Sequence, residues 1–355
     1  MDGEQAVSRE STTATVILAR DDVARLLPVR DCVDAVEQAF LQHARGETIP
    51  PSVLGIHVDG GGFHVKSAGL PGVAGGRPVV AVKINANFPR NPDRLGLPTI
   101  QGVIALFDAG NGRVLALLDS IEVTTLRTAA ATAVAAKHLA PEAATVAVCG
   151  CGEQGRSQLR ALACVRPFSR VDAIDTNGGR AERFATDMEA ELGVTVRVVG
   201  SPNDAARHTN IWITCTPAHQ WFLGRSHVRP GSFVAAAGAD NPEKQEIEPA
   251  LLAASVVVAD LVEQCATIGD LHHAIAAGLM RKDDVRAELA DVVAGTKPGR
   301  LKAEETIIFD STGTALQDVA AAVMVYERAL AAGAGLCVEL GGLLSTASST
   351  ASSAA

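Results

Sequence analysis

Apolar and polar positions follow two different patterns along the chain, and the pattern changes near residue 145. From there onward, short runs of β-branched and small residues alternate with segments that are long enough for helices. The runs are TVAVCG (145–150), RVDAID (170–175), VTVRVV (194–199), NIWITCT (210–216), SFVAAAGAD (232–240), SVVVAD (255–260) and TIIFDSTG (306–313). Runs of this kind, bounded by Gly, Asp or Asn, are typical of strands buried on both faces of a parallel sheet. The pattern predicts a doubly wound α/β domain.

Residues 15–125 follow the other pattern. Val33, Val36 and Phe40 have the spacing of a helix that buries one face. Stretches with alternating apolar and polar positions come next, and they are GFHVKSAG (62–69), VVAVKINANF (79–88), GVIALFDA (102–109) and RVLALLDS (113–120). Such alternation with short Gly/Asn turns predicts an antiparallel or mixed sheet. Residues 314–334 predict a last helix that packs back onto this first unit.

The predicted fold class is therefore α/β, with a doubly wound parallel sheet beside a separate, discontinuous α+β domain. We place the α+β domain at residues 15–128 and 315–340 and the doubly wound domain at residues 129–314. Residues 1–14 and 341–355 are expected to be disordered, because the start is polar and the tail LLSTASSTASSAA is of low complexity.

Composition narrows the function classes. The chain has 355 residues, a net charge of -9 and basic residues that do not gather into a stripe, so we expect no nucleic-acid partner. No apolar stretch approaches the roughly 20 residues that cross a bilayer, so we expect no membrane association. The seven cysteines show no C-x-x-C pair, which predicts reduced thiols in a cytoplasmic protein. We expect no metal site, and His64, His272 and His273 are interpreted as surface or core residues.

The segment VAVCGCGEQGRSQL (146–159) carries the first chemical signal. Gly150, Gly152 and Gly155 form a G-x-G-x-x-G pattern between a predicted strand and a predicted helix, which is typical of a dinucleotide pyrophosphate site. The alternative is an ordinary glycine-rich turn. Asp175 ends the next strand, where a carboxylate binds ribose hydroxyls and repels a 2′-phosphate, so NAD(H) is favoured over NADP(H). Arg180 lies close enough in sequence to reach such a phosphate.

Further cofactor-binding residues are expected beside this loop and at the ends of neighbouring strands. The expected set is Gly150, Gly152, Glu153, Gln154, Gly155, Asp175, Thr176, Cys215, Thr216, Thr128, Ser311 and Gly313.

Six stretches together resemble the ornithine cyclodeaminase and mu-crystallin family, which also contains an archaeal type of alanine dehydrogenase and lysine cyclodeaminases. The stretches are AVKINANFPRN (81–91), GLPTIQG (96–102), LLDSIEVTTLRTAAATAVAAKHLA (117–140), the glycine loop, AAGADNPEKQE (236–246) and FDSTGTALQD (309–318). The resemblance covers the chain between about residues 15 and 335, and LRTAAATA is more specific than the glycine loop.

The resemblance implies a Rossmann NAD-binding domain beside an α+β domain that binds substrate and forms a homodimer. It also implies hydride transfer between the nicotinamide and Cα of a small amino acid, which gives an α-imino acid. Within the family, water then releases a keto acid, an internal amine closes a ring and expels ammonia, or a cyclic imino acid is reduced.

Three residues of the α+β part acquire roles from the resemblance. Lys83 would face the substrate, where its ammonium holds the carboxylate or its amine activates water; the alternative is a lysine at a strand edge in solvent. Arg127 would bind the substrate carboxylate, and the alternative is a surface arginine at a helix end. Thr99 matches a substrate-pocket threonine, although a turn hydroxyl is an equally simple interpretation.

Asp240 ends the run SFVAAAGAD, at the edge of a parallel sheet where ligands bind. It would bind the substrate ammonium or accept its proton, with Lys244 as a charge partner, or it could simply cap the next segment. Ser52 stands where ornithine cyclodeaminases carry an arginine that helps to bind the carboxylate. Lys66, at a position where relatives have methionine, could supply the missing cation.

These features predict an NAD(H)-dependent enzyme, with Lys83, Arg127 and Asp240 as catalytic residues. The leading prediction is an ornithine-cyclodeaminase-type reaction in which NAD⁺ is regenerated. The alternatives are a net oxidoreductase, either an amino acid dehydrogenase or a cyclic imine reductase, and a crystallin-like protein that binds nucleotides or small molecules without turnover.

Overall fold

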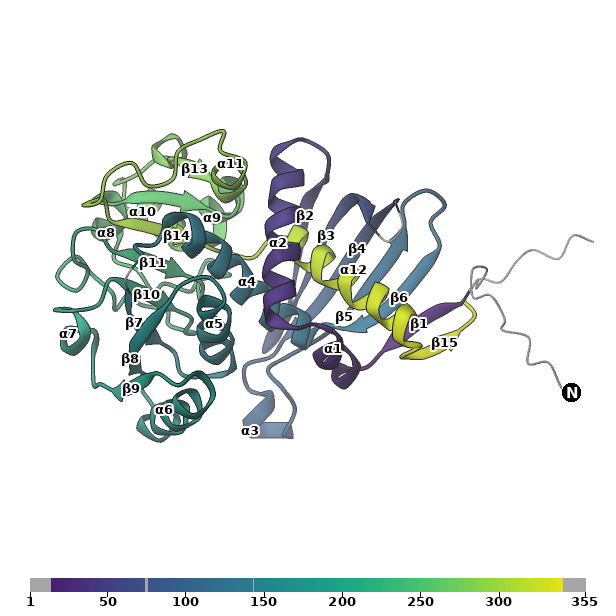
Figure 1. The fold of residues 1–355 in the computed structure, drawn as a ribbon, viewed down its shortest axis with the longest axis horizontal. Helices are drawn as coiled ribbons and strands as arrows, with labels where there is room; N and C mark the ends of the chain where they lie inside the picture. Colours follow the sequence, from purple (N-terminus) through teal and green to yellow (C-terminus); the bar gives the residue numbers. More distant parts are fainter. Residues whose placement is uncertain (1–13, 74–75, 143, 341–355) are drawn as a thin grey trace, which may run out of the picture.

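Two β-sheets form the framework of the chain in a computed structural model that describes residues 14–73, 76–142 and 144–340 (Figure 1). Each sheet is built from one of the two sequence patterns. Helices α2 (Val29–Ala44) and α4 (Ile121–Leu139) lie between the two sheets in Figure 1.

The first sheet is mixed, as the alternating stretches predict. Its described strands are β1 (Thr15–Leu18), β2 (Ile49–Val58), β3 (Gly61–Val73), β4 (Arg77–Asn87), β5 (Ile100–Asp108), β6 (Val114–Asp119) and β15 (Leu336–Val338). They lie in the order β15-β1-β6-β5-β4-β3-β2. Only the β1–β6 pair among these described strands is parallel, and the other neighbours are antiparallel.

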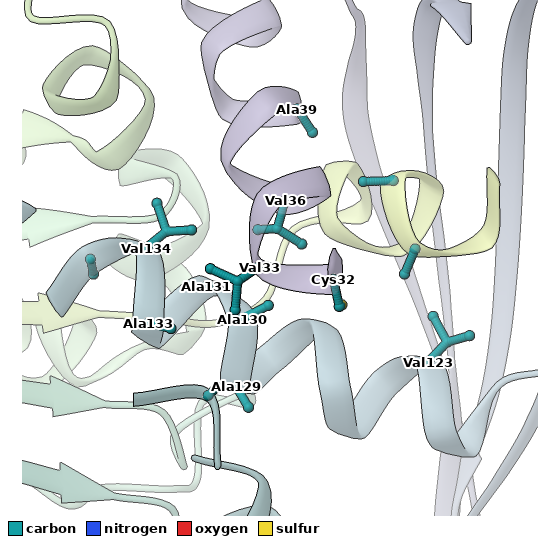
Figure 2. Close-up of a cluster of buried hydrophobic side chains, with 14 of the residues drawn as sticks. Cys32, Val33, Val36, Ala39, Val123, Ala129, Ala130, Ala131, Ala133 and Val134 are labelled. Atoms are coloured by element: carbon teal, nitrogen blue, oxygen red, sulfur yellow. The ribbon is translucent and has the colours of Figure 1, made fainter. Parts of the chain in front are cut away.

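Helix α12 (Ala315–Ala332) lies across the first sheet and packs on β3 and β4, with α2 beside it (Figure 1). The short helices α1 (Arg20–Leu26) and α3 (Asn91–Leu95) complete this part. Figure 2 shows the core where α2 meets α4: Val33 and Val36 of α2 lie against Ala130 and Ala131 of α4. The alanines let the two helices approach closely, and full burial of each valine contributes about 1.5–3 kcal/mol.

The second sheet is parallel throughout its described strands. These are β7 (Ala144–Cys149), β8 (Phe168–Ile174), β9 (Thr195–Val198), β10 (Ile211–Thr214), β11 (Phe233–Ala236), β12 (Val256–Ala259), β13 (Ala287–Glu288) and β14 (Ile307–Asp310). Their order is β13-β12-β14-β11-β10-β7-β8-β9. Strand order reverses at β7, which has β8 on one side and β10 on the other. In such sheets ligands bind at the carboxyl ends of the strands beside this reversal.

Helices surround the parallel sheet on both sides (Figure 1). Their bounds are α5 (Glu153–Ala163), α6 (Gly178–Leu192), α7 (Pro202–Ala205), α8 (Pro249–Ala253), α9 (Val262–Ile268), α10 (Asp270–Ala276) and α11 (Leu289–Val293), with a 3₁₀ turn at Lys282–Asp284. The α/β fold class and the doubly wound parallel sheet predicted from the sequence are thus confirmed.

The predicted domain boundaries remain predictions. The boundary after residue 128 falls inside the continuous helix α4, whereas the boundary after residue 314 falls directly before α12. The expected disorder concerns residues 1–13 and 341–355, which lie outside the described residues. Across the described ranges, no helix combines the length and apolar character that a membrane span requires.

Candidate active site

Two lysines lie side by side on neighbouring strands at the centre of the candidate site. The β3–β4 register places Lys66 directly opposite Lys83. Because directly opposed residues of an antiparallel pair project from the same face, both side chains leave the sheet in the same direction. Only 8% of Lys66 and 2% of Lys83 is exposed. Two buried ammonium groups this close require negative partners.

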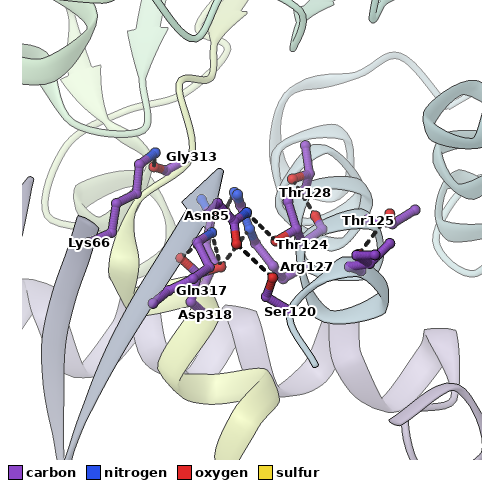
Figure 3. Close-up of polar contacts among 12 residues, drawn as sticks. Lys66, Asn85, Ser120, Thr124, Thr125, Arg127, Thr128, Gly313, Gln317 and Asp318 are labelled. Atoms are coloured by element: carbon purple, nitrogen blue, oxygen red, sulfur yellow. Dashed lines mark hydrogen bonds and ion pairs between the residues drawn. The ribbon is translucent and has the colours of Figure 1, made fainter. Parts of the chain in front are cut away.

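Asp318, in the first turn of α12, is the main negative partner (Figure 3). The Lys83 ammonium lies 2.8 Å from each of its carboxylate oxygens. Arg127, on α4, places its Nε 2.9 Å from Asp318 Oδ1 and donates from Nη1 to Gln317 Oε1 at 2.7 Å. The α12 carboxylate therefore joins a strand lysine to a helix arginine in a buried ion cluster.

The buried cluster shifts the pKa values of its members. Burial, followed by the charge of Arg127, lowers the pKa of Lys83 to about 7, although the charge of Asp318 acts in the opposite direction. Burial and Arg127 likewise lower the pKa of Lys66. Burial alone would raise the pKa of Asp318, but Arg127 and Lys83 outweigh it and hold that pKa below its ordinary value. Near neutral pH, Lys83 can therefore both accept and donate a proton.

The loop that follows β14 links the parallel sheet to the face of the first sheet that carries Lys66 and Lys83. Lys66 Nζ donates to the backbone carbonyls of Thr312, at 3.2 Å, and Gly313, at 2.6 Å. Asp260 accepts from the Gly313 amide at 2.6 Å. A Cβ atom at Gly313 would lie 2.3 Å from Nη1 of Arg127, so glycine allows this arginine to approach. The Lys66 and Arg127 side chains therefore both meet the carboxyl end of β14.

Asn85 belongs to a second polar network on the same face of the first sheet. Its Oδ1 accepts from Ser120 Oγ at 2.6 Å, and its Nδ2 donates to Thr124 Oγ1 at 3.2 Å. Figure 3 shows this network beside Arg127. It fixes the start of α4 against β4 and so helps to hold the arginine in place.

Asp240 and Lys244 lie in the loop after β11. Their side chains form an ion pair of 2.7 Å, the partnership that the sequence suggests. Burial raises the pKa of Asp240, but Lys244 and then Lys66 outweigh that effect and lower it overall. Burial lowers the pKa of the half-buried His64, on β3; the charge of Asp240 acts to raise this pKa, and the charge of Lys244 acts to lower it. The β11 loop therefore faces the end of β3 that carries His64.

The glycine loop fits a dinucleotide. Gly150 follows β7 with a φ of +104°, in the region that favours glycine. A Cβ at Gly155 would lie 2.1 Å from the Gly150 carbonyl oxygen, so only glycine permits this contact between strand and helix. A Cβ at Gly152 would meet nothing within 4 Å, which leaves open space at the N-terminus of α5. The three positions satisfy the requirements of a pyrophosphate loop.

Asp175 organises the same loop from the end of β8. Its carboxylate accepts from the backbone amides of Cys151, at 2.9 Å, and Asn177, at 2.8 Å. Arg180 approaches it at 3.6 Å and is half exposed. A carboxylate at this position can accept hydrogen bonds from the ribose hydroxyls of NAD, and its negative charge repels the 2′-phosphate of NADP.

Glu246 holds the carboxyl ends of β10 and β11 together, a role that the sequence did not suggest. Its buried carboxylate accepts from the Thr214 hydroxyl, from the amide and hydroxyl of Thr216, and from the Gly238 amide. The pKa of Glu246 is raised, chiefly by burial. Thr216 and the adjacent Cys215 therefore lie beside the glycine loop, and Cys215 Sγ is 3.4 Å from the Gly150 carbonyl oxygen.

The remaining predicted cofactor residues are spread around the loop. Thr128 donates to the Thr124 carbonyl, and Gln154 reaches the Thr125 carbonyl at 3.4 Å. Ser311 donates to Asp260 at 3.3 Å. Glu153 and Thr176 are exposed.

Two predicted substrate residues lie apart from the ion cluster. Ser52 is exposed on β2 and pairs with Ser67, so its side chain points to the face opposite Lys66 and Lys83. Thr99 lies between α3 and β5, and its backbone carbonyl accepts from the Phe88 amide. No hydrogen bond joins its side chain to the cluster within the described residues.

Sequence reasoning missed Asp318, Gln317 and Asp260 as members of the site. Asp318 ends the stretch FDSTGTALQD, which carries part of the resemblance, but its position in a predicted helix gave no indication of a partner. Asp260 ends the run SVVVAD, and the rule that ligands bind at carboxyl strand ends could have marked it. Among the described residues, no three His, Cys, Asp or Glu side chains gather in a way that suits a metal ion.

Comparisons with known proteins find relatives over almost the whole chain. Residues 13–333 match the profile of the Ornithine cyclodeaminase/mu-crystallin family. A putative dehydrogenase of Rhizobium meliloti is 39% identical over 332 residues, which cover 92% of this chain and 99% of that protein. An archaeal alanine dehydrogenase dimer with bound NAD superposes with a TM-score of 0.86 at 34% identity, covering 92% and 99% of the two chains. The Δ¹-pyrroline-2-carboxylate reductase of Thermococcus litoralis, in complex with NADH and L-proline, gives 0.86 at 30% identity, covering 91% and 100%.

Proposed function

Because the chain belongs to the ornithine cyclodeaminase/mu-crystallin family, we propose that it is an NAD(H)-dependent oxidoreductase that interconverts a small α-amino acid and its α-imino acid. The observation that carries this proposal is the buried cluster of Lys83, Asp318 and Arg127 at the carboxyl end of the parallel sheet. In this cluster the Arg127 guanidinium and the Lys83 amine, whose pKa is about 7, lie on the same carboxylate of Asp318.

The residues divide the chemistry between them. The Arg127 guanidinium would hold the substrate carboxylate. The Lys83 amine would accept the proton that leaves the amino group during oxidation, and its ammonium would return that proton during reduction. Asp318 keeps both cations in place without touching the substrate. Gly150, Gly155 and Asp175 would hold NAD, which supplies the hydride acceptor or donor.

The electrostatics favour net oxidoreduction over cyclodeamination of a basic amino acid. A basic substrate brings a second ammonium group beside the buried Lys66 and Lys83, whereas the charge of Lys244 is compensated by Asp240. Repulsion between like charges in a buried site costs several kcal/mol. Cyclodeamination, favoured by the sequence analysis, remains the second candidate, because the family includes such enzymes.

We also propose that the chain forms a homodimer, as its archaeal alanine dehydrogenase neighbour does. Leu54, Ile84 and Val103 lie next to one another across neighbouring strands, on the face of the first sheet that is turned away from Lys83. Their exposed fractions are 58%, 42% and 38%, respectively. Ile56 and Val58 extend this exposed apolar face. Such a face is typical of a protein interface. Light scattering should give about twice the chain mass of 36.6 kDa.

A panel of amino acids with NAD⁺ tests the reaction. Ammonia and absorbance at 340 nm are followed together, first with stoichiometric and then with catalytic NAD⁺. Net oxidoreduction gives one NADH for each amino acid oxidised, with an equal amount of ammonia where water hydrolyses the imino acid and no ammonia where the product is a cyclic imino acid. Ammonia without NADH accumulation identifies the cyclodeaminase, and no response from any amino acid or imine would refute the proposed function.

Cofactor preference should follow Asp175. Because its carboxylate opposes a 2′-phosphate, we expect tighter binding of NADH than of NADPH, and replacement of Asp175 by serine should narrow or reverse this preference. Fluorescence titration with both dinucleotides measures the ratio. A wild-type preference for NADPH would show that Arg180, not Asp175, decides the choice.

The pH dependence of kcat/KM should follow the protonation of Lys83. Its pKa lies at about 7, below the ordinary 10.5, so the amine is charged below that pH and neutral above it. We expect kcat/KM for amino acid oxidation to rise with pH through about 7, as the neutral base forms. Asp318→Asn removes a charge that raises this pKa, so the rise should move to lower pH. An unchanged profile in Asp318→Asn would assign the inflection to another group.

A further inference from the structure

Gln317 stands where a helix cap is expected, and its side chain does something else. Thr314 is the N-cap of α12 and Gln317 follows three residues later, which is the sequence signature of a capping box. In a capping box each of the two side chains binds the backbone amide of the other residue. The structure has no side-chain cap at Thr314. Gln317 is 1% exposed, and its side chain turns to Arg127 (Figure 3).

This arrangement is unfavourable for local stability. The buried hydroxyl of Thr314 and the buried Nε2 of Gln317 have no hydrogen-bond partner in the described part of the chain. Buried polar groups without a partner cost free energy, which a completed capping box would have reduced. Where a local rule of stability is broken in this way, a functional reason is expected.

Gln317 accepts the one directed hydrogen bond that Arg127 donates to a described residue. The distance from Arg127 Nη1 to Gln317 Oε1 is 2.7 Å. Asp318 lies 2.9 Å from Arg127 Nε, but the Nε hydrogen makes no hydrogen bond. The contact with Asp318 therefore compensates charge, whereas the contact with Gln317 fixes the rotation of the guanidinium plane.

Nη2 of Arg127 is left available to a ligand. It donates to none of the described residues, and unlike Nε it is not closed off from solvent. A Cβ atom at Gly313 would lie 3.0 Å from Nη2, so glycine keeps this side of the guanidinium clear. Arginine binds a carboxylate best through two parallel N–H···O bonds, so the rotation of the guanidinium decides whether such a pair forms.

The neutral amide of Gln317 preserves the positive charge of Arg127. When Lys83 is neutral, Arg127 and Asp318 together carry no net charge. A carboxylate at position 317 would then make the cluster negative and repel a substrate carboxylate. When Lys83 is protonated, a carboxylate would cancel the remaining positive charge. Gln317 orients the guanidinium in both states without adding charge.

We propose that Gln317 is a positioning residue for Arg127: its side-chain carbonyl sets the rotation of the guanidinium so that Nη2 meets the α-carboxylate of the substrate. The inference rests on the proposed function, because it concerns how the same site binds an amino or imino acid. Gln317 acts through Arg127 and does not touch the substrate.

Gln317→Met tests this role, because methionine keeps the length of the side chain and removes the acceptor. With an amino acid that the NAD⁺ panel identifies as a substrate, KM should rise about 10-fold or more while kcat stays within about 3-fold, since the carboxylate contact is made in ground and transition states alike. Gln158→Met, at a fully buried glutamine of α5, is the matched control and should leave both constants unchanged. A lower melting temperature together with weaker NADH binding in Gln317→Met would assign Gln317 a structural role and overturn the inference.

A double-mutant cycle with Arg127→Met separates positioning from direct contact. If Gln317 acts only through Arg127, Gln317→Met should lower kcat/KM by less than about 3-fold in the Arg127→Met background. A loss as large as the loss in the wild-type background would show that the amide contacts the substrate, and it would overturn the positioning role.

Binding of propionate to the NADH-loaded protein tests the same contact without turnover. Calorimetry would compare propionate with propionamide, which has nearly the same shape and no charge, at about pH 8, where Lys83 with its pKa of about 7 is largely neutral. We expect the wild type and Gln158→Met to prefer propionate by about 10-fold or more, and Gln317→Met by less than about 3-fold.

Two results of this comparison would overturn the inference: no preference for propionate in the wild type, or the full wild-type preference in a Gln317→Met variant that melts and binds NADH normally. Turnover of amino acids with unchanged KM in that variant would also overturn it and leave the oxidoreductase intact. Failure to use any amino or imino acid with NAD(H) would instead refute the proposed function, and the propionate comparison would still decide the role of Gln317.

Discussion

Lys83→Ala should lower kcat by about 10²–10⁴-fold, the usual contribution of a positioned acid or base, while the affinity for NADH stays the same. The loss is expected because Lys83 is the neutral-pH titrating group beside Arg127, and its pKa is about 7. Dinucleotide affinity should survive because the glycine loop begins at β7, in the other sheet. Steady-state kinetics and fluorescence titration with NADH measure the two effects separately.

Two variants make this test specific. Lys83→Met keeps most of the side-chain volume and removes only the amine, so it separates loss of chemistry from a packing defect. Lys297→Met removes an exposed lysine paired with Asp291 and should leave kcat unchanged. Near-normal turnover in both Lys83 variants would assign Lys83 a structural role.

Asp318→Asn should destabilise the protein by about 3–5 kcal/mol at a pH below 7, because it leaves two buried cations without their carboxylate. The substitution keeps the shape of the side chain, so packing is conserved. The destabilisation should shrink as the pH rises toward about 7. Without Asp318 the pKa of Lys83 falls further, so Lys83 of the variant loses its proton at a lower pH than Lys83 of the wild type does. Once Lys83 is neutral, it no longer needs the carboxylate as a partner.

Denaturant unfolding at several pH values measures this effect. Asp291→Asn, at the partly exposed pair with Lys297, serves as the matched control and should cost at most about 1 kcal/mol. If Asp318→Asn is no more destabilising than Asp291→Asn at acidic pH, Asp318 does not compensate the charges of Lys83 and Arg127.

The sequence predicted the fold where periodicity is strong. Runs such as 145–150 and 306–313 became β7 and β14 of the parallel sheet, and the alternating stretch 79–88 lies in β4. Short or irregular elements were missed. Strand β2 contains Pro50 and Pro51 and is largely exposed, and β15 has only three residues, so neither shows a clear apolar alternation.

The candidate site was predictable only in part, because its contacts depend on register and on distant packing. Lys83 and Arg127 were identified through the resemblance, but their common partner Asp318 is 235 residues from Lys83 in the sequence. The opposition of Lys66 and Lys83 depends on the β3–β4 register, and that pairing is irregular between Leu70 and Val73. No periodicity argument gives such a register.

Transfer of deuterium from labelled NADH tests the proposed chemistry most directly. The protein would be incubated with oxaloacetate or pyruvate, ammonia and NADH that carries deuterium at one or the other C4 position, and the amino acid product would be analysed by mass spectrometry. We predict that one of the two labelled cofactors places a single deuterium at Cα, with one NADH consumed for each amino acid formed, and that Lys83→Met slows this transfer as strongly as it lowers kcat. Unconsumed NADH and no label at Cα with either cofactor and either oxo acid would contradict hydride transfer at this site.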